Sequence, residues 1–142
     1  MALTKNETQV QWSGSDSVTL NSSSEFVSDA VAFDDTDVAA VLQVSVDNQG
    51  TAASGDVVTV RILYTSGDVL GDSGADYDTS EHSEQFQLDT VAANTPGEDP
   101  ARKTISLNDM IAAGGFKLSV SCPNAATRNI VVRARLKTQR AA

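Results

Sequence analysis

Apolar and polar residues alternate along two long stretches of this chain, and a short run of turn-forming residues interrupts each stretch. In the first stretch, residues 38–64, the even-numbered positions on both sides of a Gly/Ala/Ser-rich turn are apolar. A period of two is typical of a strand with one buried face and one wet face. We therefore expect 38–64 to form a half-buried antiparallel hairpin that sets the core of the fold.

The second alternating stretch lies near the C-terminal end. Residues 116–122 and 130–136 carry apolar side chains at their even positions, and the sequence PNAATRN between them is typical of a turn. This pattern predicts a second hairpin. Arg133, Arg135 and Lys137 fall on odd positions, so the pleat places them on the outward face of the last strand.

Shorter apolar runs predict further strands at 8–12, 17–20, 24–33, 85–89 and 103–107. The run 24–33 alternates poorly, as a strand at a sheet edge or corner does. A single helical turn is expected at 108–113, capped by Asn108 and closed by Gly114 and Gly115. Two segments without apolar periodicity are expected to be loops: the acidic run 65–84, and 90–102, which contains two prolines.

About eight short strands with almost no helix predict an all-β protein, an antiparallel two-sheet β-sandwich. We prefer a jelly roll over an immunoglobulin-like domain, because the chain has a single Cys and so lacks the disulfide that an immunoglobulin core places beside a Trp. Residues 24–142 are expected to form one sandwich domain. The polar N-terminal segment 1–23 is either an ordered edge strand or an extended arm.

With 142 residues, the chain is long enough to bury a core without a disulfide or a metal. Its first residues lack the basic and apolar run of a signal peptide, and no stretch approaches the ~20 apolar residues of a membrane helix. We therefore expect a protein made in the cytoplasm and not inserted in a membrane.

Charge is distributed unevenly along the chain. Residues 1–101 hold eighteen acidic side chains against Lys5 and Arg61, whereas 102–142 hold eight basic side chains against Asp109 alone, and the net charge is −9. Net acidity opposes nonspecific binding to nucleic acid, since phosphates would be repelled. The uneven distribution favours a polarised surface that meets a complementary protein partner.

Six residues are candidates for such a partner interface. On an edge strand, outward charges would serve to prevent pairing with other sheets; alternatively, they form a docking surface for an acidic partner or for the acidic half of a second copy. The only Trp is either a core residue or an anchor in a partner's pocket. The candidates are Trp12, Arg128, Arg133, Arg135, Lys137 and Arg140.

We find no catalytic constellation, cofactor motif or convincing metal site, and we expect the protein not to be an enzyme. His82 is the only histidine and no nucleophile motif surrounds a Ser, while Cys122 lies on an apolar strand face and is expected to be buried. The acidic loop offers only weak calcium candidates, because DSGADYD lacks the EF-hand order. They are Asp72, Asp76 and Asp78, with Asp68 nearby.

The segments TSGDVLGDSGADYDTSEHSEQFQLDT and NTPGEDPARKTISL resemble small β-rich virion proteins of tailed bacteriophages, in particular capsid decoration (cement) proteins. The resemblance extends over about 37–136. It implies a jelly-roll or related sandwich that binds the outside of the assembled shell, contacts the major capsid protein, often associates as a homotrimer, and stabilises the shell. It implies no catalytic residues and a location on the virion surface.

Two other functions stay open. One is a structural role in the phage tail or at the head–tail junction on the same sandwich. The other is a ligand-binding module, for instance one for carbohydrate, which would require an aromatic platform that Trp12, Tyr64 and Tyr77 do not clearly supply.

Overall fold

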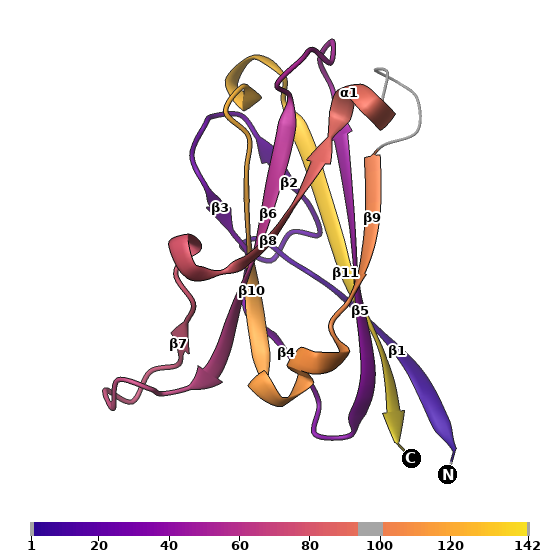
Figure 1. Cartoon of the computed structure of the whole chain (residues 1–142), viewed down its shortest axis with the longest axis vertical. Helices are drawn as coiled ribbons and strands as arrows, with labels where there is room; N and C mark the ends of the chain where they lie inside the picture. Colours follow the sequence, from indigo (N-terminus) through magenta and orange to yellow (C-terminus); the bar gives the residue numbers. More distant parts are fainter. Residues whose placement is uncertain (1, 94–100, 142) are drawn as a thin grey trace.

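The two alternating stretches of sequence supply the central strands of two different β-sheets (Figure 1). The computed structural model of the protein describes residues 2–93 and 101–141. Sheet A contains β5 (Asp37–Asn48) and β11 (Ile130–Ala141), and sheet B contains β6 (Val57–Gly67) and β10 (Gly115–Ser121). All pairings are antiparallel.

Shorter strands complete both sheets. The strand order in sheet A is β1-β11-β5-β9, with β2 also beside β11; in sheet B it is β3-β10-β6-β7, with β4 beside β10 and β8 beside β6. The bounds are β1 Leu3–Gln9, β2 Val18–Leu20, β3 Phe26–Val27, β4 Val31–Ala32, β7 Asp76–Tyr77, β8 Glu84–Asp89 and β9 Ala101–Ser106. The polar N-terminal segment thus contributes two strands, β1 and β2, to sheet A.

Both predicted hairpins are wrong. β5 pairs with β11 and β9, whereas β6 pairs with β10, β7 and β8, so residues 49–56 cross from one sheet to the other. In the same way, 122–129 carries the chain from β10 in sheet B to β11 in sheet A. Period-two alternation shows that each strand has one buried face. Two such strands fit the pattern whether they pair side by side in a hairpin or face each other across a core.

The prediction of an all-β, antiparallel two-sheet sandwich is confirmed. The chain crosses between the sheets from β5 to β6, from β8 to β9, from β9 to β10 and from β10 to β11, as in jelly-roll sandwiches, whereas β6 and β8 pair within sheet B. The described residues contain eleven strands rather than about eight, since 24–33 divides into β3 and β4 and the acidic loop contains the short β7. Among the described residues, no helix is both long and apolar enough to cross a membrane.

The core lies between the sheets and contains the even-numbered positions of the four central strands. Leu42 and Leu136 from sheet A and Ile62 and Leu118 from sheet B are almost completely buried. Phe116 stacks at a tilt against Phe33, with 5.6 Å between ring centroids. Buried aliphatic side chains from both sheets therefore supply most of the hydrophobic stabilisation.

The helical segments among the described residues are short: η1 (Ser80–His82), α1 (Thr90–Ala93), η2 (Asn108–Ala113) and η3 (Ala125–Thr127). The turn predicted at 108–113 is therefore confirmed as η2, and Gly114 ends it in the left-handed region with φ of 100°. Asn108 does not cap it, because its Oδ1 accepts the amide of Ala40 instead. Of the predicted loop 90–102, Pro96, Gly97 and Pro100 lie outside the described residues.

Candidate binding groove on the outer face of sheet A

Three basic side chains of β11 point outward from the middle of sheet A. Arg133 and Arg135 are exposed and Lys137 is partly exposed, as the alternation predicts. β11 is not an edge strand, because β1 and β2 pair along one side of it and β5 along the other. Prevention of sheet-to-sheet pairing therefore does not explain these charges.

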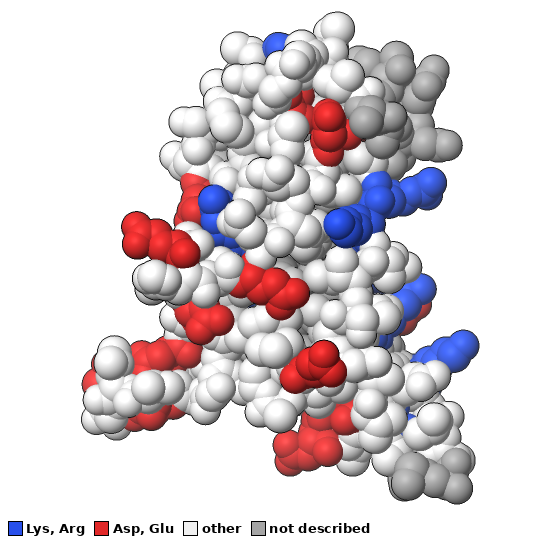
Figure 2. All heavy atoms as spheres, in the orientation of Figure 1, with Lys and Arg blue, Asp and Glu red and all other residues white. Residues whose placement is uncertain are grey.

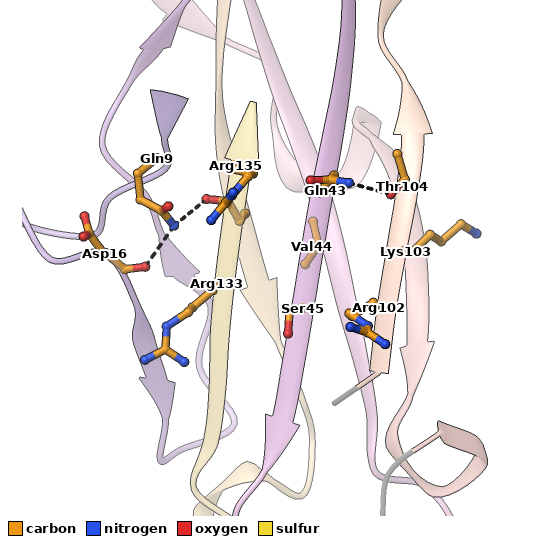
Figure 3. A pocket seen from close by; sticks show the side chains of 11 residues that line it. Gln9, Asp16, Gln43, Val44, Ser45, Arg102, Lys103, Thr104, Arg133 and Arg135 are labelled. Carbon is orange, nitrogen blue, oxygen red and sulfur yellow. Dashed lines mark hydrogen bonds between the residues drawn. The ribbon is translucent and has the colours of Figure 1, made fainter. Parts of the chain in front are cut away.

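Two rows of outward side chains cross sheet A at this level. Strand register places Gln9, Arg135, Gln43 and Thr104 opposite one another across β1, β11, β5 and β9. One pleat further along, Arg133, Ser45 and Arg102 form a second row. Figure 3 shows these side chains on neighbouring strands, with Gln43 and Ser45 between the arginines of β11 and Arg102 on β9.

The two rows line an open groove of about 580 Å³, which we call the basic groove. Its lining residues are Gln9, Asp16, Gln43, Val44, Ser45, Arg102, Lys103, Thr104, Arg133, Ala134 and Arg135. Their polar groups are guanidinium, amide and hydroxyl groups with one ammonium and one carboxylate, and the lining contains no His or Cys. This set can bind carboxylates or other hydrogen-bond acceptors on a partner.

The guanidinium groups of the groove are largely available to a partner. Among the described residues, neither Arg102 nor Arg133 makes an ion pair. Arg135 and Lys137 share one carboxylate, that of Glu7, each over 3.4 Å. Exposed pairs of this kind contribute little to stability and exchange easily for other partners.

Part of the groove is held in place by hydrogen bonds within the sheet. The Gln9 Nε2 donates to the carbonyl of Ala134 over 3.0 Å and also reaches the carbonyl of Asp16 over 3.4 Å (Figure 3). On the other side, Gln43 Nε2 donates to Thr104 Oγ1 over 3.4 Å. These contacts fix the polar floor between the arginines, so the groove has a defined shape before any partner binds.

Two of the predicted interface arginines are used inside the molecule. Arg128 Nε lies 2.6 Å from Asp56 Oδ2, and Arg140 Nε lies 2.8 Å from Asp37 Oδ1. Both aspartate side chains are fully buried. The hydrogen bond with Asp37 raises the pKa of Arg140. The structure therefore brings Arg133, Arg135 and Lys137 together on one face, and places Arg128 and Arg140 elsewhere.

Trp12 belongs to the core rather than to the surface. Its side chain is 6% exposed and lies in the same buried cluster as Val10 and Leu20. The indole Nε1 donates to the carbonyl of Phe26 over 3.4 Å. Trp12 is thus not displayed to a partner in this conformation.

The sequence did not indicate Gln9, Gln43 or Arg102 as members of the groove. Arg102 precedes the predicted strand 103–107, where alternation with Ile105 would have placed it outward with Thr104. Its closeness to Arg133 depends on the pairing of β9 with β5 and of β5 with β11, which no local pattern contains.

The acidic loop brings together Asp68, Asp72 and Asp76, whose carboxylate oxygens lie within 4.8 Å of one another, while Asp78 is not in this group. The carboxylate of Asp68 accepts the amides of Gly71, Asp72 and Ser73, and that of Asp76 accepts the amides of Val69 and Leu70. Hydrogen bonds to the Asp68 carboxylate lower its pKa, and the largest contribution comes from the backbone amide of Ser73. These carboxylates serve to hold the loop backbone.

The other residues considered for chemistry stay apart from the groove. His82 is exposed in η1. Cys122 is buried as predicted, and burial raises the pKa of its thiol, which keeps it in the less reactive protonated form. Lys103 lines the groove, but its Nζ lies 5.5 Å from the centroid of the Phe86 ring and points away from the arginines in Figure 3.

Neither a protein-family model nor a curated protein sequence matches this chain. Among solved structures, the xylan-binding module CBM15 is 12% identical over 96% of this chain and 89% of that one, with a TM-score of 0.46. A decameric BFDV capsid protein is 6% identical over 99% of both chains, with a TM-score of 0.43. A protein of Bacillus endospore appendages, a family of disulfide-linked pili, is 8% identical over 99% of this chain and 89% of that one, with a TM-score of 0.40. These β-rich neighbours thus include capsid, pilus and carbohydrate-binding proteins, and with TM-scores below 0.5 they carry no argument about function.

Proposed function

We propose that this protein is a non-enzymatic structural protein whose basic groove docks onto an acidic protein surface. More specifically, we propose a capsid decoration protein, which binds the outside of an assembled virion shell, contacts the major capsid protein and stabilises the shell. The main support for the proposal is the groove. Arg133 and Arg135 on the central strand β11 and Arg102 on the edge strand β9 line it, in a protein of net charge −9.

The charge pattern supports a protein partner over nucleic acid. Basic atoms gather along the margin of the molecule where sheet A lies, whereas acidic atoms form separate patches over the remaining, mostly uncharged face in Figure 2. A phosphate backbone would meet the groove but would be repelled by the rest of the surface. A protein with a local acidic patch would meet only the groove, which gives orientation as well as attraction.

The mechanics of the sandwich also suit a stabilising role. β5 and β11 pair over most of their length, from Arg140 and Asp37 at one end to Ile130 and Asn48 at the other. Buried Asp–Arg pairs lie near both ends of this ladder. A rigid body of this kind can link neighbouring capsid subunits without losing shape, and self-association, for which we propose a homotrimer, would multiply its contacts.

Co-sedimentation with the capsids of the virus that carries this chain tests the proposal. Wild-type protein should pellet with mature shells, and the double variant R133E/R135E should bind at least about tenfold more weakly because two attractive charges become repulsive. Lys5→Glu reverses one charge outside the groove lining and should bind normally. Failure of the wild type to pellet with any mature shell would overturn the decoration role; equal binding of all three proteins would overturn the role of the groove.

Carbohydrate binding is the second candidate, because the row of Gln9, Gln43 and Thr104 offers amide and hydroxyl groups on an open sheet face. It lacks an aromatic surface: Trp12 and Tyr64 are buried, and Tyr77 lies under the Nζ of Lys117 at 4.5 Å. A glycan array separates the two functions, since saturable binding to one glycan class with no binding to shells would favour the carbohydrate module.

A further inference from the structure

The most exposed large apolar side chains of the described chain lie at the end of a projecting loop. Val69 and Leu70 are both 76% exposed, and they lie next to each other between β6 and β7. Figure 1 shows this loop extending away from the body of the sandwich at the lower left. We call residues 68–78 the acidic tip, because they contain four aspartates and no lysine or arginine.

The acidic tip is organised before any partner binds. Asp76 Oδ2 accepts the amides of Val69 and Leu70, both over 2.8 Å. Asp68 accepts three further amides over 2.7 to 3.1 Å. The backbone donors therefore turn inward and the two apolar side chains turn outward. A preorganised loop loses little conformational entropy on binding, which favours a role in recognition.

The tip and the basic groove are complementary in charge and lie on opposite sides of the molecule. Acidic atoms border the projecting loop at the lower left of Figure 2, and basic atoms gather along the right-hand margin, over sheet A. One chain cannot bring its own tip to its own groove across the sandwich. A second copy can present its tip there without rearrangement of either copy.

We propose that the acidic tip of one copy docks in the basic groove of a second copy. The proposal rests on the docking role proposed above for the groove; within the oligomer, the tip of a second copy rather than the shell occupies it. Asp72 and Asp78, both exposed, would pair with guanidinium groups of Arg102, Arg133 and Arg135. Val69 and Leu70 would lie against the aliphatic stems of these arginines, which can cover apolar surface while their charged ends remain solvated.

A tip-to-groove contact is heterologous, because it uses two different surfaces of the same chain. Such contacts close into a ring when the rotation between copies allows it. In a ring, each copy uses both its tip and its groove, so the two contacts add to the area that a single loop would bury alone. This arrangement agrees with the homotrimer proposed for the decoration protein.

Sedimentation velocity of the full chain tests the contact. At about 50 mM NaCl the wild type should associate as concentration rises, and association should weaken at about 1 M NaCl, where charges are screened within about 3 Å. The groove variant R133E/R135E and the tip variant D72K/D78K should each remain monomeric, with dissociation constants raised at least about tenfold. The matched controls are Lys5→Glu and Asp35→Lys, exposed charge changes outside both surfaces that should associate like wild type.

Mixing the two variants provides the decisive measurement. The groove variant keeps the acidic wild-type tip, and the tip variant keeps the basic wild-type groove, whereas D72K/D78K brings the net charge of the tip from −4 to zero. Each variant alone lacks one of the two surfaces, but in a mixture the wild-type tip of one meets the wild-type groove of the other, so mixed oligomers should form. V69S/L70S should weaken wild-type association with no change in melting temperature, since both side chains are exposed in the monomer.

A wild type that stays monomeric at low salt, or variants that still associate alone, would overturn the proposal. So would a mixture that fails to associate although both variants melt at the wild-type temperature. These results are separable from the shell experiment. A monomer that pellets with shells through the groove would support the proposed function and overturn this inference. Oligomers that depend on the tip but pellet with no shell would support this inference and overturn the decoration role.

Discussion

Arg128 Nε donates to Oδ2 of the buried Asp56 over 2.6 Å, and this pair joins the two connections that carry the chain between the sheets. Asp56 ends the β5–β6 connection, and Arg128 lies in the β10–β11 connection. Asn48 and Asn124 donate their amides to the same carboxylate, over 3.2 and 3.1 Å. The cluster thus fastens one end of the sandwich with charge-assisted hydrogen bonds.

Replacing Arg128 should therefore destabilise the fold. Arg128→Met keeps the aliphatic stem but leaves a buried carboxylate without its cation, which costs about 3 kcal/mol in the free energy of unfolding. Urea denaturation measures the change. Arg133→Met is the matched control, since Arg133 is exposed, and it should change the free energy of unfolding by less than about 0.5 kcal/mol. Equal effects of the two variants would contradict the role of the pair.

The same cluster predicts how stability depends on pH. Burial would raise the pKa of Asp56, but hydrogen bonds from Arg128, the Ala53 amide, Asn124 and Asn48 outweigh it, so the pKa lies below its ordinary value. A carboxyl with a lowered pKa in the folded state stabilises above its unfolded pKa of about 3.9, and this contribution is lost as pH falls through the folded pKa.

Asp56→Asn removes this titration. The variant should be less stable than wild type at pH 7, and the difference should shrink as pH falls below about 4. Urea denaturation from pH 7 down to pH 2 measures it. Asp34 and Asp68, whose pKa values are also lowered, titrate in both proteins and cancel in the comparison. A difference that stays constant over the whole range would show that Asp56 does not contribute in this way.

The strands could be predicted from the sequence, but their partners could not. Alternation located β5, β6, β10 and β11, because an inward side chain at every second position is required wherever a strand covers a core. The same alternation fits a hairpin and a crossing between sheets. Asp56, at the end of the first turn, marks the crossing in the structure, since its buried carboxylate accepts hydrogen bonds from Arg128 and Asn124 of the other connection.

Of the basic groove, only the residues on β11 could be predicted from the sequence. Outward placement of Arg133 and Arg135 follows from the pleat, but their neighbours Gln9 and Arg102 come from strands far away in sequence. Arg128 and Arg140 were misplaced for a local reason. They lie just before β11 and near its end, where the chain leaves the regular ladder and a long side chain can turn inward to a buried aspartate.

Gly115 should tolerate no side chain. A Cβ at this position would lie 2.6 Å from the carbonyl oxygen of Val31, where β4 pairs closely with β10. Gly115→Ala should therefore cost about 2 kcal/mol, because the β4 backbone must move away. Gly74→Ala is the control, since its Cβ would meet nothing nearer than 3.7 Å. Thermal unfolding compares them, and a Gly115→Ala protein as stable as the control would contradict the close approach.

Trp12 should act as a core residue and not as an anchor for a partner. Trp12→Ala removes a buried ring and should cost about 3 kcal/mol or more, whereas Leu3→Ala, at a side chain that is 50% exposed, should cost little. Because Trp12 is the only tryptophan, its fluorescence reports on this site alone. The emission maximum should be that of a buried indole in the free protein, should stay there as protein concentration rises, and should shift to the red only on unfolding. An anchor would behave in the opposite way: its emission would change on association, and its loss would weaken association while leaving the melting temperature unchanged.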